Sequence, residues 1–224
     1  MPETPYFVSY PEAVKILESQ PLTLPTETIP LDQGYNRIIS RNLDSKVDDP
    51  RFDNSAMDGF AFRHQDSTPA PARLQITQTI QAGPANPPGA IVKGQTARIM
   101  TGAPMPEGAD AILPIELCEV DEENKTVLLL EEGKKHFIRK QGENLQEGHT
   151  ALHKATVLTP SSIGLCATMG YSEIPVFSQA KIGIVSTGDE LQTPGMPLKD
   201  GEIYESNSFG LVGLVKWAGH QAKR

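Results

Sequence analysis

Residues 53–61 read Asp53-Asn54-Ser55-Ala56-Met57-Asp58-Gly59-Phe60-Ala61, a run of turn-forming residues that leads into an apolar segment. Asn-Ser and Asp-Gly favour turns, because their side chains bind backbone N–H groups and glycine accepts a positive φ. The same texture, short β-prone runs separated by Gly, Pro, Asn and Asp, extends from about residue 43 to residue 160. The expected strands are Leu74–Ile80, Thr96–Met100, Ala111–Val120, Thr126–Leu130 and Ala155–Leu158, with a hairpin turn at residues 121–125. This pattern predicts a β-rich region of sandwich or barrel type.

Helical patterns flank the β-prone region. Residues 9–19 are expected to form a helix, with Ser9 as its cap and Pro11 in its first turn. A weaker helical pattern covers residues 30–41, and a third predicted helix runs from residue 159 to about residue 169 and stops at Gly170.

The last segment of the chain changes character again. Lys181–Ser186 is a short, continuous apolar run, as expected for a strand that is buried on both faces of a parallel sheet. A polar loop follows, and then a predicted helix from Asn207 or Ser208 to Gly219. Strand, loop and helix in this order predict the opening of an α/β unit. The sequence ends at Arg224, so we expect this unit to be incomplete and its strand to lack partners.

Composition narrows the classes of function. The formal net charge is −8, which argues against nucleic acid as a partner, because phosphate backbones require clustered Lys and Arg. The only cysteines, Cys118 and Cys166, form no C-x-x-C pair, so we expect no disulfide framework and a cytoplasmic location. No signal-peptide pattern stands at the N-terminus. No apolar run approaches the roughly 20 residues that cross a bilayer, so no membrane role is expected.

Two loops of the β-prone region carry candidate site residues. Asp58 would lie in a cleft and hold a metal or a ligand hydroxyl, although the same residues also suit a purely structural turn. In the run Arg98–Asp110, Thr101 offers a hydroxyl and Gly102 an unobstructed N–H, which suits an anionic oxygen. A stiff connection between strands is the alternative. Gly142-Glu143-Asn144 reads as a turn and is a weak signal by itself.

A third candidate loop, Ser186-Thr187-Gly188-Asp189-Glu190, follows the strand predicted at 181–186. Ligands of open α/β sheets bind at the carboxyl ends of the strands, so this loop has a favoured position. It contains no lysine and is not a P-loop. Two adjacent carboxylates indicate a Mg²⁺ ion that bridges to phosphate, and the alternative is that Asp189 and Glu190 cap the next element.

Taken together, the ordered motifs resemble those of the molybdopterin molybdenumtransferases, the MoeA and gephyrin E-domain family. The matching runs are Pro50–Ala61, Arg98–Ala111, Gly142–Asn144, Ser186–Leu191 and Gly201–Asn207, with Glu205 in the usual place of an Asp. Several motifs in the right order are far more specific than any one of them. The resemblance covers the whole chain.

The resemblance implies an α+β multidomain fold, with a β-rich domain and a linker domain followed by an incomplete α/β (MogA-like) domain. The implied ranges are an N-terminal helix segment at 1–26, a linker domain at 27–47 and 141–178, the β-rich domain at 48–140, and the α/β start at 179–224. It also implies a homodimer, with the molybdopterin adenylyltransferase as a candidate partner. The implied reaction inserts molybdate into adenylylated molybdopterin, a small-molecule pterin substrate, and releases AMP with the help of Mg²⁺.

Site residues follow from the resemblance position by position. Asp58, Thr101 and Glu190 would be catalytic, and Asp189 with Glu190 would hold Mg²⁺. Ser186, Thr187, Gly188 and Asn144 would bind the pterin substrate, although Asn144 is an acid in many relatives. Asp58 and Thr101 would come from the other subunit and close the cleft.

One departure from the family matters for activity. The basic residues and the Gly-Gly-Val-Ser-type loop that complete the family's site do not occur in this sequence. An acidic pocket alone repels molybdate and a pterin phosphate, so we expect this chain to be inactive by itself. Two alternatives stay open: a non-catalytic dimerising or scaffold module, and a generic Mg²⁺-dependent phosphohydrolase built on residues 187–190.

Overall fold

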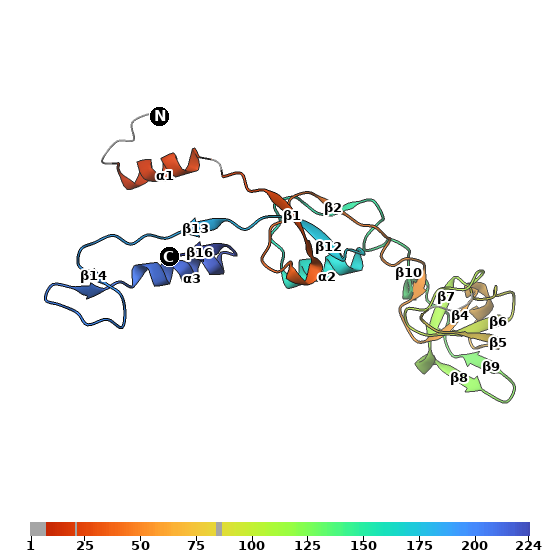
Figure 1. Cartoon of the computed structure of the whole chain (residues 1–224). Coiled ribbons are helices and arrows are strands. Elements are labelled where there is room, and N and C mark those ends of the chain that lie inside the picture. Colours follow the sequence, from red (N-terminus) through yellow and green to blue (C-terminus); the bar gives the residue numbers. More distant parts are fainter. Residues whose placement is uncertain (1–7, 21, 84–86) are drawn as a thin grey trace. The chain divides into compact units, whose positions relative to one another are not determined.

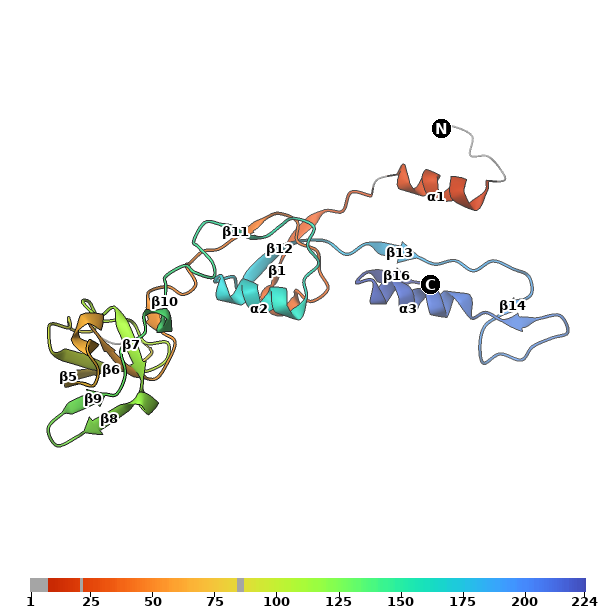
Figure 2. The same cartoon turned by 180° about the vertical axis from the view of Figure 1, so that it is seen from behind.

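The computed structural model describes residues 8–20, 22–83 and 87–224 (Figure 1; reverse view in Figure 2). The chain divides into two compact units. The first unit comprises Met1–Asn42, His153–Gly164 and Ser172–Arg224, and the second comprises Leu43–Leu152 and Leu165–Tyr171.

The second unit is built around a six-stranded sheet with the order β7-β4-β6-β5-β9-β8. Its strands are β4 (Gly59–Phe62), β5 (Ala72–Ile80), β6 (Gln95–Ile99), β7 (Ala111–Pro114), β8 (Cys118–Asp121) and β9 (Thr126–Leu129). Neighbouring strands are antiparallel, except for β5 and β6, which run parallel. The sheet confirms the predicted β-rich domain, and the hairpin between β8 and β9 has its turn where the sequence indicated it.

One predicted strand of this sheet is wrong. The run Ala111–Val120 forms two strands, β7 and β8, separated by the 3₁₀ turn η3 (Ile115–Leu117). Pro114 stands at the break with φ −57°. Proline has no N–H to donate to a ladder and fixes φ, so the strand ends there.

The core of the second unit covers both faces of its central strands. Phe60 and Phe62 point to one face of β4 and pack with Leu113, whereas Ala61 points to the other face and packs with Ile112. This alternation follows from the two-residue period of a strand. All five side chains are fully buried. Strand β4, which leads out of the Asp58 turn, therefore lies in the most protected part of the unit.

Short elements complete the second unit. Strand β2 pairs with β11, and β3 pairs with β10, both antiparallel. The bounds are β2 (Leu43–Asp44), β3 (Asn54–Ser55), β10 (Ile138–Arg139), β11 (Thr150–Leu152), and the 3₁₀ turns η2 (His64–Ser67) and η4 (Lys135–Phe137).

The first unit contains the antiparallel pair β1 (Thr26–Pro30) and β12 (Glu173–Phe177). The helix predicted at 30–41 is wrong: only a 3₁₀ turn, η1 (Leu31–Gln33), forms there. A Cβ on Gly34 would lie 3.0 Å from the Leu31 carbonyl oxygen and 2.7 Å from Ile174 Cδ1, so glycine allows close packing at this bend. Likewise, the strand predicted at 155–158 is reduced to one isolated bridge, between Val157 and Ile38.

The predicted helices at 9–19 and 159–169 are confirmed. Helix α1 (Tyr10–Glu18) begins after Ser9, whose N–H donates to the Glu12 carboxylate at 2.9 Å. Helix α2 (Pro160–Thr168), within which the division between the two units falls, is followed by Gly170 with φ +85°. A glycine in this left-handed conformation is a common helix stop.

The C-terminal segment of the first unit contains β13 (Lys181–Gly183), β14 (Leu191–Gln192), β15 (Ile203–Tyr204), α3 (Asn207–Trp217) and β16 (Gln221–Lys223). The predicted helix is confirmed as α3. The predicted buried strand 181–186 is wrong, because β13 has three residues and all three are exposed. It also has a partner, since it pairs in parallel with β16. Among the described residues, no helix is long and apolar enough to cross a bilayer.

Candidate functional site

The turn that carries Asp58 is joined by backbone hydrogen bonds to the loop that carries Thr101. Ser55 N–H donates to the Ala103 carbonyl at 3.0 Å, and Gly102 N–H donates back to the Ser55 carbonyl at 2.8 Å. Inside the turn, the buried Ser55 hydroxyl accepts the Met57 N–H at 3.2 Å. Two motif runs, about 40 residues apart in sequence, therefore form a single structural feature.

Gly59 fixes the backbone directly after Asp58. A Cβ on Gly59 would lie 2.1 Å from the Leu113 carbonyl oxygen, so only glycine permits this approach of β4 to β7. The Asp58 carbonyl accepts the Ile115 N–H at 3.0 Å. Asp58 is thus held at the start of a buried strand while its own side chain stays exposed.

The structure brings the predicted residues Asp58 and Thr101 into direct contact. Thr101 donates its backbone N–H at 2.6 Å and its hydroxyl at 2.7 Å to the same oxygen, Asp58 Oδ1. These two bonds, the backbone one foremost, hold the pKa of the Asp58 carboxyl below its ordinary value. The result is an ionised, oriented carboxylate at the surface whose Oδ2 lies outside this pair.

Asn144 lies in a separate part of the second unit, in a turn rich in carboxylates. Its Nδ2 donates to Asp49 Oδ2 at 2.9 Å, and its N–H donates to the Asp49 carbonyl at 3.0 Å. Beside it, Gln141 donates its side-chain amide to Asp48 at 2.6 Å and its N–H to Asp53 at 2.9 Å. The contact partners of Asn144 therefore fix the turn. No sequence motif singled out Gln141. Its contacts with Asp48 and Asp53 show that it helps to hold this turn in place.

The predicted loop 186–190 lies in the first unit. Ser186 donates its hydroxyl to Glu205 Oε1 at 2.9 Å. Glu205 also accepts the Ser208 N–H and the Ser208 hydroxyl, both at 2.6 Å, and these bonds lower the pKa of its carboxyl. The residue that caps α3 is therefore Glu205 and not Asp189 or Glu190.

Asp189 and Glu190 offer two adjacent, exposed carboxylates. A Cβ on Gly188 would lie 2.5 Å from Glu190 Oε2, so the Glu190 carboxylate folds back over the glycine. Thr187 is exposed as well. Within the described part of the chain, no group of three or more His, Cys, Asp or Glu side chains could hold a metal. Mg²⁺ is commonly bound through one or two carboxylates with substrate phosphates and waters, and this pair fits such a shared ion.

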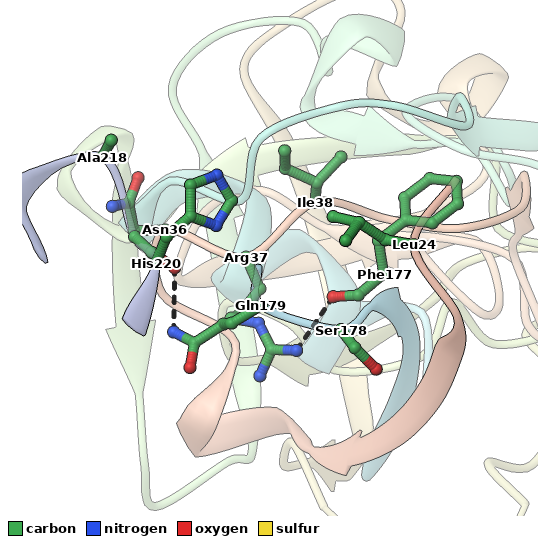
Figure 3. Close-up of a pocket in the computed structure, with 10 residues that line it drawn as sticks. Leu24, Asn36, Arg37, Ile38, Phe177, Ser178, Gln179, Ala218 and His220 are labelled. Carbon is green, nitrogen blue, oxygen red and sulfur yellow. Dashed lines mark hydrogen bonds between the residues drawn. The ribbon is translucent and has the colours of Figure 1, made fainter. Parts of the chain in front are cut away.

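A small pocket of the first unit, with a volume of about 20 Å³, contains none of the predicted site residues (Figure 3). Its polar side chains are used internally. Gln179 donates to the Gly219 carbonyl at 2.9 Å, Arg37 donates to the Phe177 carbonyl at 2.9 Å, and Asn36 donates to the Trp217 carbonyl at 3.2 Å. These contacts tie the end of α3 to residues 36–37 and 177–179, which indicates a packing junction.

Residues 8–170 match the model of the family described as the MoeA N-terminal region (domain I and II). Molybdopterin molybdenumtransferase 2 of Mycobacterium tuberculosis (strain CDC 1551 / Oshkosh) is 40% identical over 197 residues, which covers 86% of this chain and 48% of that protein. The molybdopterin molybdenumtransferase of Synechococcus elongatus is 36% identical over 223 residues, which covers 96% and 55%. The chain spans about half the length of these curated relatives.

A solved structure of similar fold is the molybdopterin biosynthesis moeA protein from Pyrococcus horikoshii OT3. It superposes with a TM-score of 0.87 at 29% sequence identity, and the match covers 96% of this chain and 58% of the other.

Proposed function

Because this chain belongs to the family of the MoeA N-terminal region (domain I and II), we propose that it takes part in molybdenum cofactor biosynthesis. The proposed reaction inserts molybdate into adenylylated molybdopterin and releases AMP. The observation that carries this proposal is the contact of Thr101 with Asp58, at 2.6 and 2.7 Å, which joins two of the motif runs at one exposed carboxylate.

The proposed role of Asp58 and Thr101 is to hold a charged oxygen in a fixed orientation. Thr101 keeps the Asp58 carboxyl ionised, because its two donors stabilise the charged form. The ionised Oδ2 can then accept a proton or hydrogen bond from the substrate or from water. We propose that this pair acts across the interface of a homodimer.

The loop 186–190 would supply a second group of site residues. Ser186, Thr187 and Gly188, together with Asn144, would bind the pterin substrate. Asp189 and Glu190 would hold Mg²⁺, and Glu190 would also act on the reacting group. When bound, Mg²⁺ would neutralise charge on the substrate's phosphates. Residues 179–224 would be the opening of a MogA-like α/β domain, in a cytoplasmic enzyme that receives its substrate from the molybdopterin adenylyltransferase.

The chain alone is expected to be inactive. Its proposed site residues carry three carboxylates, Asp58, Asp189 and Glu190, and no cation. Such a set repels molybdate and phosphate through like charge. Titration calorimetry with adenylylated molybdopterin and Mg²⁺, with and without molybdate, measures recognition separately from turnover. Steady AMP release by the purified 224-residue chain would contradict the inactivity.

A chimera tests the function itself. The chain would replace the matching half of the Synechococcus elongatus relative, which it covers over 223 residues. We expect this chimera to release AMP from adenylylated molybdopterin in the presence of molybdate. Asp58→Asn should lower that rate by about 100-fold, a typical loss for a proton-transfer group. Asp121→Asn is the matched control, because the Asp121 carboxylate also accepts a backbone N–H and has a pKa below its ordinary value. If Asp58→Asn and Asp121→Asn were equally active, the proposed role of Asp58 would be wrong.

A further inference from the structure

A polar cleft of about 350 Å³ lies in the second unit, at the end of β4 opposite to Asp58. It is lined by Arg63, His64, Gln65, Gly108, Asp110 and Lys135. The four residues of β4 lie between Asp58 and Arg63, which are therefore roughly 17 Å apart along the strand. None of the residues proposed for the molybdenum reaction lines this cleft, so the cleft has no role in that proposal.

The charges of the cleft differ from those of the chain. The chain carries a formal charge of −8, whereas the cleft contains two permanent cations, Arg63 and Lys135, and one carboxylate, Asp110. Asp110 Oδ1 accepts the His64 N–H at 2.6 Å, and Asp110 Oδ2 lies 3.2 Å from Lys135 Nζ. The Asp110 carboxylate is therefore already engaged. The residues that line the cleft sum to one positive charge, and the Asp66 carboxylate behind Arg63 offsets part of it.

Arg63 is held in place, whereas Lys135 is free to adjust. Arg63 Nε lies 3.6 Å from Asp66 Oδ2, and the arginine side chain is only 27% exposed. Asp66 is itself fixed, since its Oδ2 accepts the Gly94 N–H at 3.0 Å. The Lys135–Asp110 pair has side chains that are 66% and 55% exposed. Exposed pairs of this kind are weak, so Lys135 can turn to an incoming anion at little cost.

We propose that this cleft binds a tetrahedral oxyanion, either a phosphate group or molybdate, between Arg63 and Lys135. A guanidinium presents paired N–H donors that match the spacing of two oxyanion oxygens, and a lysine adds a mobile point charge. His64 and Gln65 add neutral hydrogen-bonding groups to the wall. The volume exceeds that of a bare oxyanion and leaves room for a small organic group attached to it.

The test is a titration of the full chain with inorganic phosphate and, separately, with sodium molybdate, followed by amide chemical shifts at low ionic strength. We expect saturable shifts at residues 63–65, 108–110 and 135. Lys135→Gln should weaken binding about tenfold, because it removes one charged donor. Lys134→Gln is the matched control: it makes the same charge change at the adjacent position, where the side chain pairs with Glu131 and does not line the cleft. Its effect should stay below about twofold.

A third variant acts in the opposite direction. Asp110→Asn removes the only carboxylate of the cleft and should tighten binding severalfold, since it adds one net positive charge. The proposal would be overturned if neither phosphate nor molybdate gave saturable chemical-shift changes. Equal losses in Lys134→Gln and Lys135→Gln would also overturn it, because they would indicate general surface attraction. Saturation by either anion supports the proposal, and the tighter of the two identifies the ligand.

Discussion

At the residue scale, Thr101 donates two hydrogen bonds to Asp58 Oδ1, one from its backbone N–H and one from its hydroxyl. Thr101→Val keeps the backbone donor and removes the hydroxyl. We expect the pKa of Asp58 to rise toward its ordinary value, because one of the two bonds that stabilise the carboxylate is lost. Thr101→Ser keeps the hydroxyl and should leave the pKa unchanged. Carboxyl ¹³C shifts, followed against pH, measure both variants, and an unshifted titration in Thr101→Val would contradict the contact.

The sign of the pH effect follows from the lowered pKa. A carboxyl with a lowered folded-state pKa contributes stability above its unfolded-state pKa and loses it as pH falls through the folded value. In Thr101→Val that loss should be smaller than in the parent chain and should be complete at a higher pH.

Gly59 gives a second prediction at this scale. Gly59→Ala would place a Cβ 2.1 Å from the Leu113 carbonyl oxygen, and its other nearest atoms are also backbone atoms, of Leu113 and Pro114, which leave little room to yield. We expect the free energy of unfolding of the second unit to fall by about 3 kcal/mol, as for other overpacked core positions. Gly89→Ala is a suitable control, since its Cβ would meet only Gln78 side-chain atoms at 3.5 Å or more. Urea unfolding measures the free energy of unfolding of both variants. If Gly59→Ala were as stable as Gly89→Ala, β4 would be able to shift away from the Leu113 carbonyl.

The sequence singled out Asp58 and Thr101 separately, but it could not show that they touch. Their contact depends on the register of β4 and β6, in which Gly59 faces Ile99 and brings the two loop residues together at one end. Register is a property of strand pairing and is not encoded within either motif. Similarly, no local pattern marked Gln141, whose importance lies in contacts with Asp48 and Asp53.

At the element scale, the crossing of residues 48–53 with 140–147 is held by ionised carboxylates. Asp48 accepts the Glu147 N–H at 2.8 Å and Asp53 accepts a hydrogen bond from Lys140 Nζ at 2.6 Å, which join the two segments. Glu143 accepts the Lys140 N–H at 2.8 Å within residues 140–147. These bonds lower the pKa of all three carboxyls.

We therefore predict that the crossing loosens in acid. Lowered pKa values contribute stability above the ordinary values of 3.8 for Asp and 4.5 for Glu, and this stability is lost as pH falls below them. Gln141→Ala, which removes the donor to Asp48, should reduce the loss of urea stability between pH 7 and pH 3. An identical pH dependence in the variant and the parent chain would show that Gln141 does not contribute.

Elements whose ends are marked by residues in their own sequence were predicted correctly. Elements whose structure depends on contacts with distant residues were not. Helices α1, α2 and α3 have a cap, a proline in the first turn or a terminal glycine within their own sequence. The 30–41 segment also has helical spacing of apolar residues, but Ile39 pairs with Val176 and Gly34 packs on Ile174. Those partners lie more than 130 residues away, so no local pattern could reveal them.

At the scale of the whole molecule, burial differs between the central strand of the second unit and the C-terminal helix of the first unit. Every residue of β4 is buried, whereas in α3 the only buried residue is Ser208. Leu214 and Trp217 of α3 are 60% and 83% exposed. One strand and one helix cannot close a parallel sheet, and for that reason residues 179–224 were expected to form an incomplete α/β unit whose strand lacks partners. The expectation of a missing partner was wrong, because β13 pairs with β16, and the incomplete unit stays a prediction.

Uneven burial predicts uneven protection of backbone amides. In hydrogen exchange of the full chain, amides of residues 59–62 should exchange on the order of a thousandfold more slowly than those of 207–217, because local opening of α3 exposes little additional apolar surface. The measurement should be made at two protein concentrations, since association of copies would cover exposed side chains and slow exchange at the higher one. Protection of α3 equal to that of β4 at both concentrations would contradict the prediction. It would mean that the helix is stabilised by the contacts of Asn36 and Gln179 at its end, and that these short polar contacts can substitute for a buried face.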